Sequence, residues 1–99
     1  MIVVFTDEAA ADLERIGDWI ARDNPRRAVS FVEELVACCL RIADAPEGFP
    51  LLPDHRRSGV RRRPHGPYLV FYRLQAGRIE ILHVLHGAQD YAAILFPAG

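Results

Sequence analysis

The chain has 99 residues, of which 51% are hydrophobic and 25% are charged. This size and balance predict one globular domain over residues 1–99 and exclude a disordered or fibrous chain. No apolar run approaches the length of a transmembrane helix, and residues 2–5 are too short for the apolar part of a signal peptide. We therefore expect a cytoplasmic protein without membrane contact.

The net charge of −1 conceals a strong asymmetry along the chain. Residues 1–54 hold eleven acids and five arginines, a charge of −6, whereas residues 55–99 hold seven arginines and two acids, a charge of +5. All twelve lysine or arginine positions are arginine, whose guanidinium group pairs with carboxylates in a bidentate way. The basic half could therefore face an acidic protein segment or nucleic acid.

The first half of the chain predicts a strand followed by two helices. Residues 2–5 are β-branched or aromatic and indicate a short strand. Thr6 can cap a helix that ends near Asp23, since apolar residues recur there at helical spacing. Asn24 can cap a second helix, which should stop at Pro46. Few residues join the two helices, so they should form an antiparallel hairpin.

The second half predicts a small sheet. Residues 46–57 hold three prolines and read as a loop, and strands are expected at 59–63, 68–74 and 78–85, followed by a short helix at 90–96. The predicted fold class is α+β: an N-terminal strand, an αα-hairpin, and a three-stranded antiparallel sheet with a short C-terminal helix. The hairpin must cover one face of that sheet, because both apolar stripes need a shared core.

Several chemically capable side chains have simpler structural explanations. Cys38 and Cys39 are adjacent and lack a CxxC partner, so we expect buried thiols and neither a metal nor another cofactor. His83 lies in an apolar strand and should be a hydrogen-bonded sheet residue. Tyr68 and Tyr72 share a face and should pack in the core with their hydroxyls at its margin.

Three segments, taken in order, resemble the ParE toxins of the RelE/ParE superfamily of bacterial toxin–antitoxin pairs. They are TDEAAADLERIGDWIARDNPRRAVSFVEEL at 6–35, GVRRRPHGPYLVFYR at 59–73 and IEILHVLHGAQD at 79–90. The resemblance covers nearly the whole chain. It implies the same α+β fold, inhibition of DNA gyrase by binding, and a ParD-like antitoxin that wraps the toxin with a helix and an extended strand.

RelE-type relatives are instead ribosome-dependent mRNA endonucleases. The resemblance places their catalytic arginines at Leu69 and Gln89 and their terminal tyrosine near Leu95, while a basic position survives at Arg62. Leucine cannot hold a phosphate and glutamine brings no charge, so we expect no catalytic residues. A ribonuclease with a replaced active site remains one alternative. Another is a ParE-fold protein that binds its antitoxin but is no longer toxic.

The candidate sites divide between antitoxin and target. A tryptophan is more often a core residue, but it can also anchor an amphipathic helix at an interface. An arginine-bearing edge strand can accept an added strand and an acidic tail, and a merely solvated edge is the alternative. The expected antitoxin contacts are Trp19, Arg61, Arg63 and Arg73. The expected target contacts are Arg62, on the opposite face of its strand, and His86, Gln89, Asp90 and Tyr91 after the last strand. Asp90 could also pair with Arg73. We expect no sequence-specific nucleic-acid binding by the protein alone.

Overall fold

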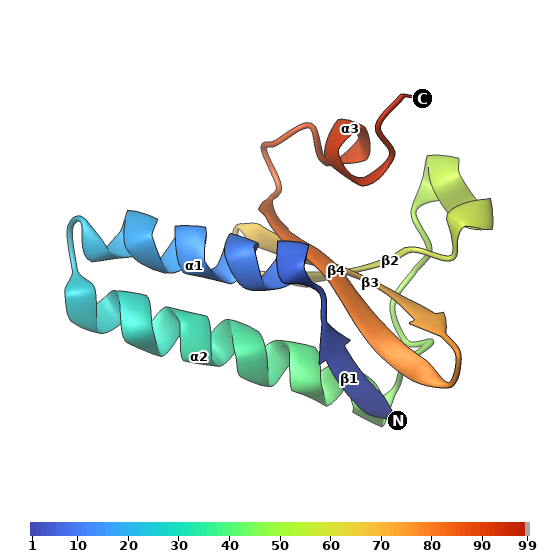
Figure 1. The fold of residues 1–99 in the computed structure, drawn as a ribbon, viewed down its shortest axis with the longest axis horizontal. Coiled ribbons are helices and arrows are strands. Elements are labelled where there is room, and N and C mark those ends of the chain that lie inside the picture. The colour runs from blue at the N-terminus through green and yellow to red at the C-terminus, as the bar shows by residue number, and fades with distance from the viewer. Residues whose placement is uncertain (99) are drawn as a thin grey trace.

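A computed structural model describes residues 1–98. Its helices and strands run in the order β1 (Ile2–Phe5), α1 (Asp7–Ala21), α2 (Pro25–Arg41), β2 (Arg61–His65), β3 (Tyr68–Gln75), β4 (Arg78–His86) and α3 (Tyr91–Leu95). Short 3₁₀ segments follow α2 at Ile42–Asp44 and precede β2 at Pro53–Ser58. Figure 1 shows the α1–α2 hairpin on one side of the sheet. The predicted α+β fold is confirmed.

The sheet has four strands in the order β1-β4-β3-β2. As predicted, β3 pairs in antiparallel fashion with both β2 and β4. The N-terminal strand joins the same sheet and runs parallel to β4, with Ile2 opposite Arg78 and Phe5 opposite Ile81. The sequence left the position of this strand open, since periodicity does not specify a pairing partner. β1 is therefore one edge of the sheet and β2 is the other.

Apolar side chains form two clusters, one on each face of the sheet. The main core packs the hairpin against the sheet, with Leu35, Tyr72 and Ile81 fully buried. A second cluster on the opposite face consists of Leu52, Val60, Phe71 and Leu85, and Tyr91, Leu95 and Phe96 pack against it. The short C-terminal helix therefore covers the sheet face that the hairpin leaves free. Tyr72 donates its hydroxyl to the carbonyl of Pro46 at 2.7 Å, as expected for a tyrosine at the core margin.

Side-chain caps fix where the helices begin. The Thr6 hydroxyl accepts from Ala9 N at 3.1 Å and donates to the Ile81 carbonyl at 2.8 Å, so it joins α1 to β4. Asn24 accepts from Arg27 N at 3.0 Å at the start of α2. In each case a side-chain oxygen accepts from a backbone N–H that the helix itself leaves unpaired. Both predicted N-caps are therefore confirmed.

The bounds of β2 and α2 differ most from the prediction. β2 begins at Arg61 and not at residue 59, because Gly59 takes a left-handed conformation, with φ 75°, that ends the preceding 3₁₀ segment. The strand then continues to His65, which shortens the turn before β3. The second helix ends at Arg41, and the following 3₁₀ turn buries Ile42 in the core before the chain reaches Pro46.

Asp12 is an acidic residue of α1 that is only 2% exposed. Its carboxylate accepts hydrogen bonds from Val84 N at 2.9 Å and from His83 Nδ1 at 2.7 Å, and it forms an ion pair with Arg15. The contact lies where β4 carries an extra residue, Leu82, relative to β3. His83 is therefore a hydrogen-bonded sheet residue, as predicted, but its partner is a buried acid that the sequence analysis missed. Asp12 ties α1 to the end of β4.

We predict that Asp12→Ala lowers the free energy of unfolding by about 2–4 kcal/mol, because Val84 N–H and the His83 ring lose their acceptor inside the protein. Urea denaturation followed by circular dichroism measures this change. Asp18→Ala is the matched control, since Asp18 is an exposed acid of the same helix, and it should change stability by less than about 0.5 kcal/mol. Equal losses in the two variants would contradict the structural role given to Asp12.

Candidate functional site

A groove of about 730 Å³ runs between α1 and the adjoining ends of β3 and β4. We call it the α1 groove. It brings together Trp19, His86 and Gln89, which the sequence analysis assigned to two different partners. Its lining residues are Asp12, Arg15, Ile16, Asp18, Trp19, Arg22, Tyr68, Val84, Leu85, His86 and Gln89.

Trp19 forms the most exposed apolar part of this groove. Its side chain is 64% exposed, and the guanidinium of Arg22 lies 4.9 Å from the centre of its ring. Buried Ile16 and Val84 provide an apolar floor. A large aromatic rim above an apolar floor suits the apolar face of a partner helix. The predicted anchor thus lies beside a groove of the right character.

The polar turn after β4 is held by its own side chains. Gln89 Oε1 accepts from His86 N at 2.8 Å, and His86 Nδ1 accepts from Ala88 N at 3.0 Å. The His86 ring also packs edge-on against Tyr68, with 5.3 Å between ring centres. The Gln89 side chain therefore stabilises the turn by a hydrogen bond to its backbone. An arginine at this position would instead bring a positive charge.

The suggested pairing of Asp90 with Arg73 is wrong. Asp90 caps α3 by accepting from Ala93 N at 3.4 Å. Arg73 instead contacts Glu80, directly opposite on β4, with 3.2 Å between Nε and Oε1. Arg78 also pairs with Glu80, and the hydrogen bonds from these two arginines keep the pKa of that carboxyl below its usual value. The register of β3 and β4 places Arg73 opposite Glu80, and this explains why Arg73 pairs with Glu80 and not with Asp90.

Arg62 and Tyr91 meet on the face of the sheet that carries α3. Arg62 Nη1 donates to the Tyr91 hydroxyl at 3.0 Å, and the Tyr91 ring centre lies 5.0 Å from that of Phe71. Leu69 and Leu95 pack against the same apolar cluster. Two of the predicted target residues therefore lie together over a surface that is otherwise apolar.

Arg61 and Arg63 extend to the other face of β2, as the alternation of a strand requires. Arg61 Nη1 donates to the Phe49 carbonyl at 2.7 Å, and the Arg63 guanidinium lies 5.3 Å from the centre of the Phe49 ring. Both side chains therefore hold the preceding loop, although Arg63 also lies at the surface. Neither residue lines the α1 groove.

The outer edge of β2 is largely occupied. Arg62 N donates to the Pro50 carbonyl at 3.2 Å, and Leu52 N donates to the Val60 carbonyl at 3.0 Å. Pro64 has no N–H with which to extend a ladder. An added strand would have to displace the loop before β2. The sequence suggested this edge because it could not show where that loop lies.

The outer edge of β1 is open: β1 is the terminal strand of the sheet, and among residues 1–98 no loop forms a backbone hydrogen bond with residues 2–5. Thr6 N donates to the Ile81 carbonyl at 3.1 Å, so alternation directs the backbone groups of Val4 to β4 and those of Val3 and Phe5 outward. Ile2 is 72% exposed beside this edge. Exposed N–H and C=O groups on such an edge can pair with an incoming strand.

The structure offers little to a metal or to a thiol-dependent reaction. No group of three or more metal-ligating side chains occurs among the described residues. Cys38 and Cys39 are fully buried, and burial raises the pKa of the Cys39 thiol to about 12. A thiol with such a pKa stays protonated and unreactive near neutral pH. Within residues 1–98, no helix has both the length and the apolar character needed to cross a membrane.

The sequence matches the family described as the ParE toxin of the type II toxin–antitoxin system parDE over residues 3–91. It is 35% identical over 88 residues to Toxin ParE1 of Caulobacter vibrioides. The aligned residues cover 88% of this chain and 90% of the relative. The structure superposes with a TM-score of 0.76 on a chain of the chromosomal ParDE system from P. aeruginosa, with 25% identity and coverage of 87% of this chain and 95% of the other. The chain therefore belongs to the ParE toxin family of type II toxin–antitoxin systems.

Proposed function

We propose that this toxin acts in the cytoplasm by binding DNA gyrase, and that a ParD-like antitoxin neutralises it. The observation that carries this proposal is the contrast between its polar and its apolar surfaces. His86 and Gln89 are hydrogen-bonded within their own turn and Asp90 caps α3, whereas the α1 groove has an apolar floor with Trp19 on its rim. An apolar groove with an aromatic side chain on its rim suits the apolar face of a partner helix.

The antitoxin helix would lie in the α1 groove with Trp19 against its apolar face. Arg22 and Asp18 line this groove and favour residues of opposite charge on the flanks of that helix, whereas Arg15 is already paired with Asp12. An extended antitoxin segment would pair with the open edge of β1, next to Val3 and Phe5. Arg63 and Arg73 remain candidates for contact with an acidic tail, and Arg61 is already engaged by the loop before β2.

The gyrase-binding surface would include Arg62 and Tyr91 on the α3 face, and His86, Gln89 and Asp90 at its margin. His86 and Gln89 also line the α1 groove. An antitoxin helix in that groove would cover these two residues and prevent their contact with the target. Neutralisation then requires only occlusion, with no change in the toxin fold.

The ribonuclease alternative has one observation in its favour. The Arg62–Tyr91 hydrogen bond brings a cation and a phenol together, and such a pair can bind phosphate and move a proton. Against it, Leu69 and Leu95 pack in the second apolar cluster and the Gln89 side chain braces the turn. We therefore rank this activity second.

We predict that Trp19→Ala weakens antitoxin binding by about 2 kcal/mol or more, roughly thirtyfold in Kd, because a central aromatic anchor is lost. The free toxin should keep its stability to within about 0.5 kcal/mol, since this side chain is largely exposed. Calorimetry with the antitoxin encoded beside the toxin measures the first effect. Val29→Ala is the control, because Val29 is 61% exposed on α2 and lies outside the α1 groove. Equal affinities of the two variants would rule out Trp19 as the anchor.

Expression without the antitoxin tests the proposed activity. We expect toxicity with induction of the SOS response and with intact translated mRNA, because a trapped gyrase leaves cleaved DNA. Coexpression of the antitoxin should abolish both the toxicity and the SOS signal. Cleaved mRNA without SOS induction would support the ribonuclease alternative. Healthy cells with neither signal would indicate a chain that binds its antitoxin without toxicity.

A further inference from the structure

Residues 53–59 form a short projection beside β2, which we call the arginine arm. Its base is closed by the hydrogen bond from Leu52 N to the Val60 carbonyl, and both of these residues are only 2% exposed. Within the arm, the Ser58 hydroxyl donates to the His55 carbonyl at 2.6 Å and accepts from Val60 N at 3.1 Å. Figure 1 shows this segment at the end of the molecule opposite the α1–α2 connection. The arm is therefore anchored at a fixed place.

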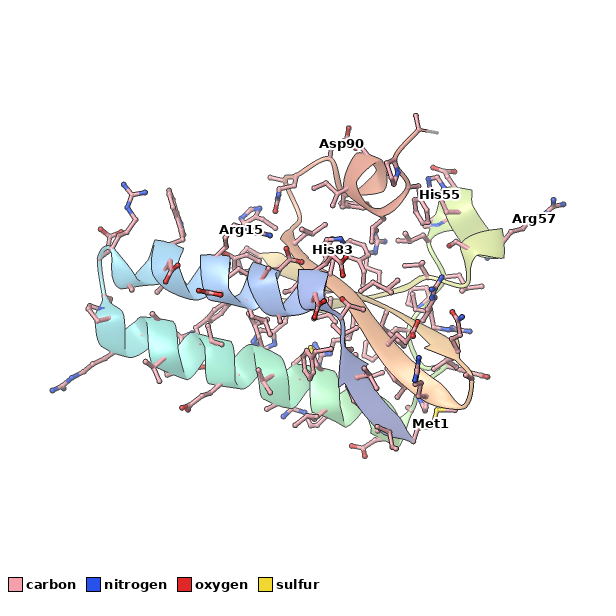
Figure 2. The ribbon with its side chains drawn as sticks, in the orientation of Figure 1. Met1, Arg15, His55, Arg57, His83 and Asp90 are labelled. Carbon is pink, nitrogen blue, oxygen red and sulfur yellow. The ribbon has the colours of Figure 1, made fainter. Side chains whose placement is uncertain are left out.

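The arm carries two adjacent arginines without a partner. Eight of the twelve arginines contact a carboxylate, a backbone carbonyl, a hydroxyl or an aromatic ring. Among residues 1–98, Arg26, Arg41, Arg56 and Arg57 have no such contact, and only the last two are neighbours in the chain. Figure 2 shows Arg57 pointing away from the body of the molecule. These two guanidinium groups are free to bind an anion.

A stacked aromatic pair lies beside these arginines. The rings of His55 and Phe96 are 4.2 Å apart between centres, and their planes differ by 19°. Both residues line a hollow of about 450 Å³, together with Arg56, Arg57 and Ser58. Asp54 also lines this hollow and is the one acid of the arm. Two cations and a flat aromatic surface therefore share one small surface.

We propose that the arginine arm binds single-stranded nucleic acid without sequence preference. Arg56 and Arg57 would contact successive phosphates in the bidentate geometry that guanidinium favours. An unpaired base would stack on the His55–Phe96 pair, as bases do on aromatic side chains in sequence-tolerant sites. An acidic peptide could use the two arginines, but its carboxylate side chains cannot stack on the aromatic pair as a base can.

The charge distribution favours binding of a polyanion at the arm. Residues 1–54, which include the hairpin, carry a charge of −6, and residues 55–99, which begin within the arm, carry a charge of +5, so the hairpin repels a polyanion and the basic half of the chain attracts it. This site is separate from the α1 groove and from the β1 edge. It does not depend on the proposed antitoxin contacts or on gyrase as the target.

Fluorescence anisotropy with a labelled oligodeoxythymidine of about 12 nucleotides tests the proposal, a length within the range of about 4–16 nucleotides that such sites cover. Binding should weaken as salt rises, and the double variant Arg56→Gln/Arg57→Gln should reduce the slope of log K against log salt by about 1.4, or about 0.7 per lost phosphate contact. Phe96→Leu should weaken binding about fivefold or more while leaving that slope unchanged. Circular dichroism establishes that each variant is folded.

The double variant Arg26→Gln/Arg41→Gln is the matched control. It removes the same charge from α2, at two other unpartnered arginines, and should leave the slope unchanged. An equal loss in both double variants would mean that only net charge matters. That result would overturn the proposal, as would the absence of binding at the lowest salt or equal binding of a labelled polyglutamate.

Discussion

The buried carboxylate of Asp12 connects the helical layer to the sheet. An ionised group that is 2% exposed is costly unless donors surround it, and here it receives Val84 N–H, the His83 ring and Arg15. These donors come from α1 and from β4. The contact therefore fixes the distance and the rotation of the helix against the end of the strand. It also sets the two walls of the α1 groove, whose lining includes Asp12 itself.

The two faces of the sheet differ in what covers them. The hairpin covers one face with a continuous core, and the groove beside α1 is the part that it leaves open. A loop and the short helix α3 cover the other face with a smaller cluster. The Arg62–Tyr91 hydrogen bond lies over this second cluster, and the arginine arm lies beside it. The proposed antitoxin and target surfaces meet only at His86 and Gln89, which explains how one bound helix can block the target.

Local features of the fold could be predicted from the sequence. Thr6, Asn24 and Asp90 cap helices because each cap needs only a side-chain oxygen and the next few residues. The opposite orientations of Arg61 and Arg62 follow from strand alternation alone. The family resemblance also rested on three contiguous segments of the sequence, and the match over residues 3–91 confirmed it.

Long-range features escaped prediction for a physical reason. The pairing of β1 with β4, the Asp12–Val84 hydrogen bond and the cover on the β2 edge each join residues that are distant in the sequence. Hydrophobic periodicity does not specify such partners. One signal was available for Asp12, since it falls on the inner face of α1 at helical spacing from Ala9 and Ile16. The edge that can accept a strand became apparent only from the loop that closes β2.

Hydrogen–deuterium exchange of the toxin with and without its antitoxin tests the central claim most directly, because it reports which backbone amides the partner covers. The account predicts slower exchange in the complex at residues 2–6 of the β1 edge and at residues 15–22 of α1, and unchanged exchange at residues 61–65 of β2. Slower exchange confined to residues 61–65 would contradict it. That result would place the antitoxin on the edge that the loop already occupies in the free toxin.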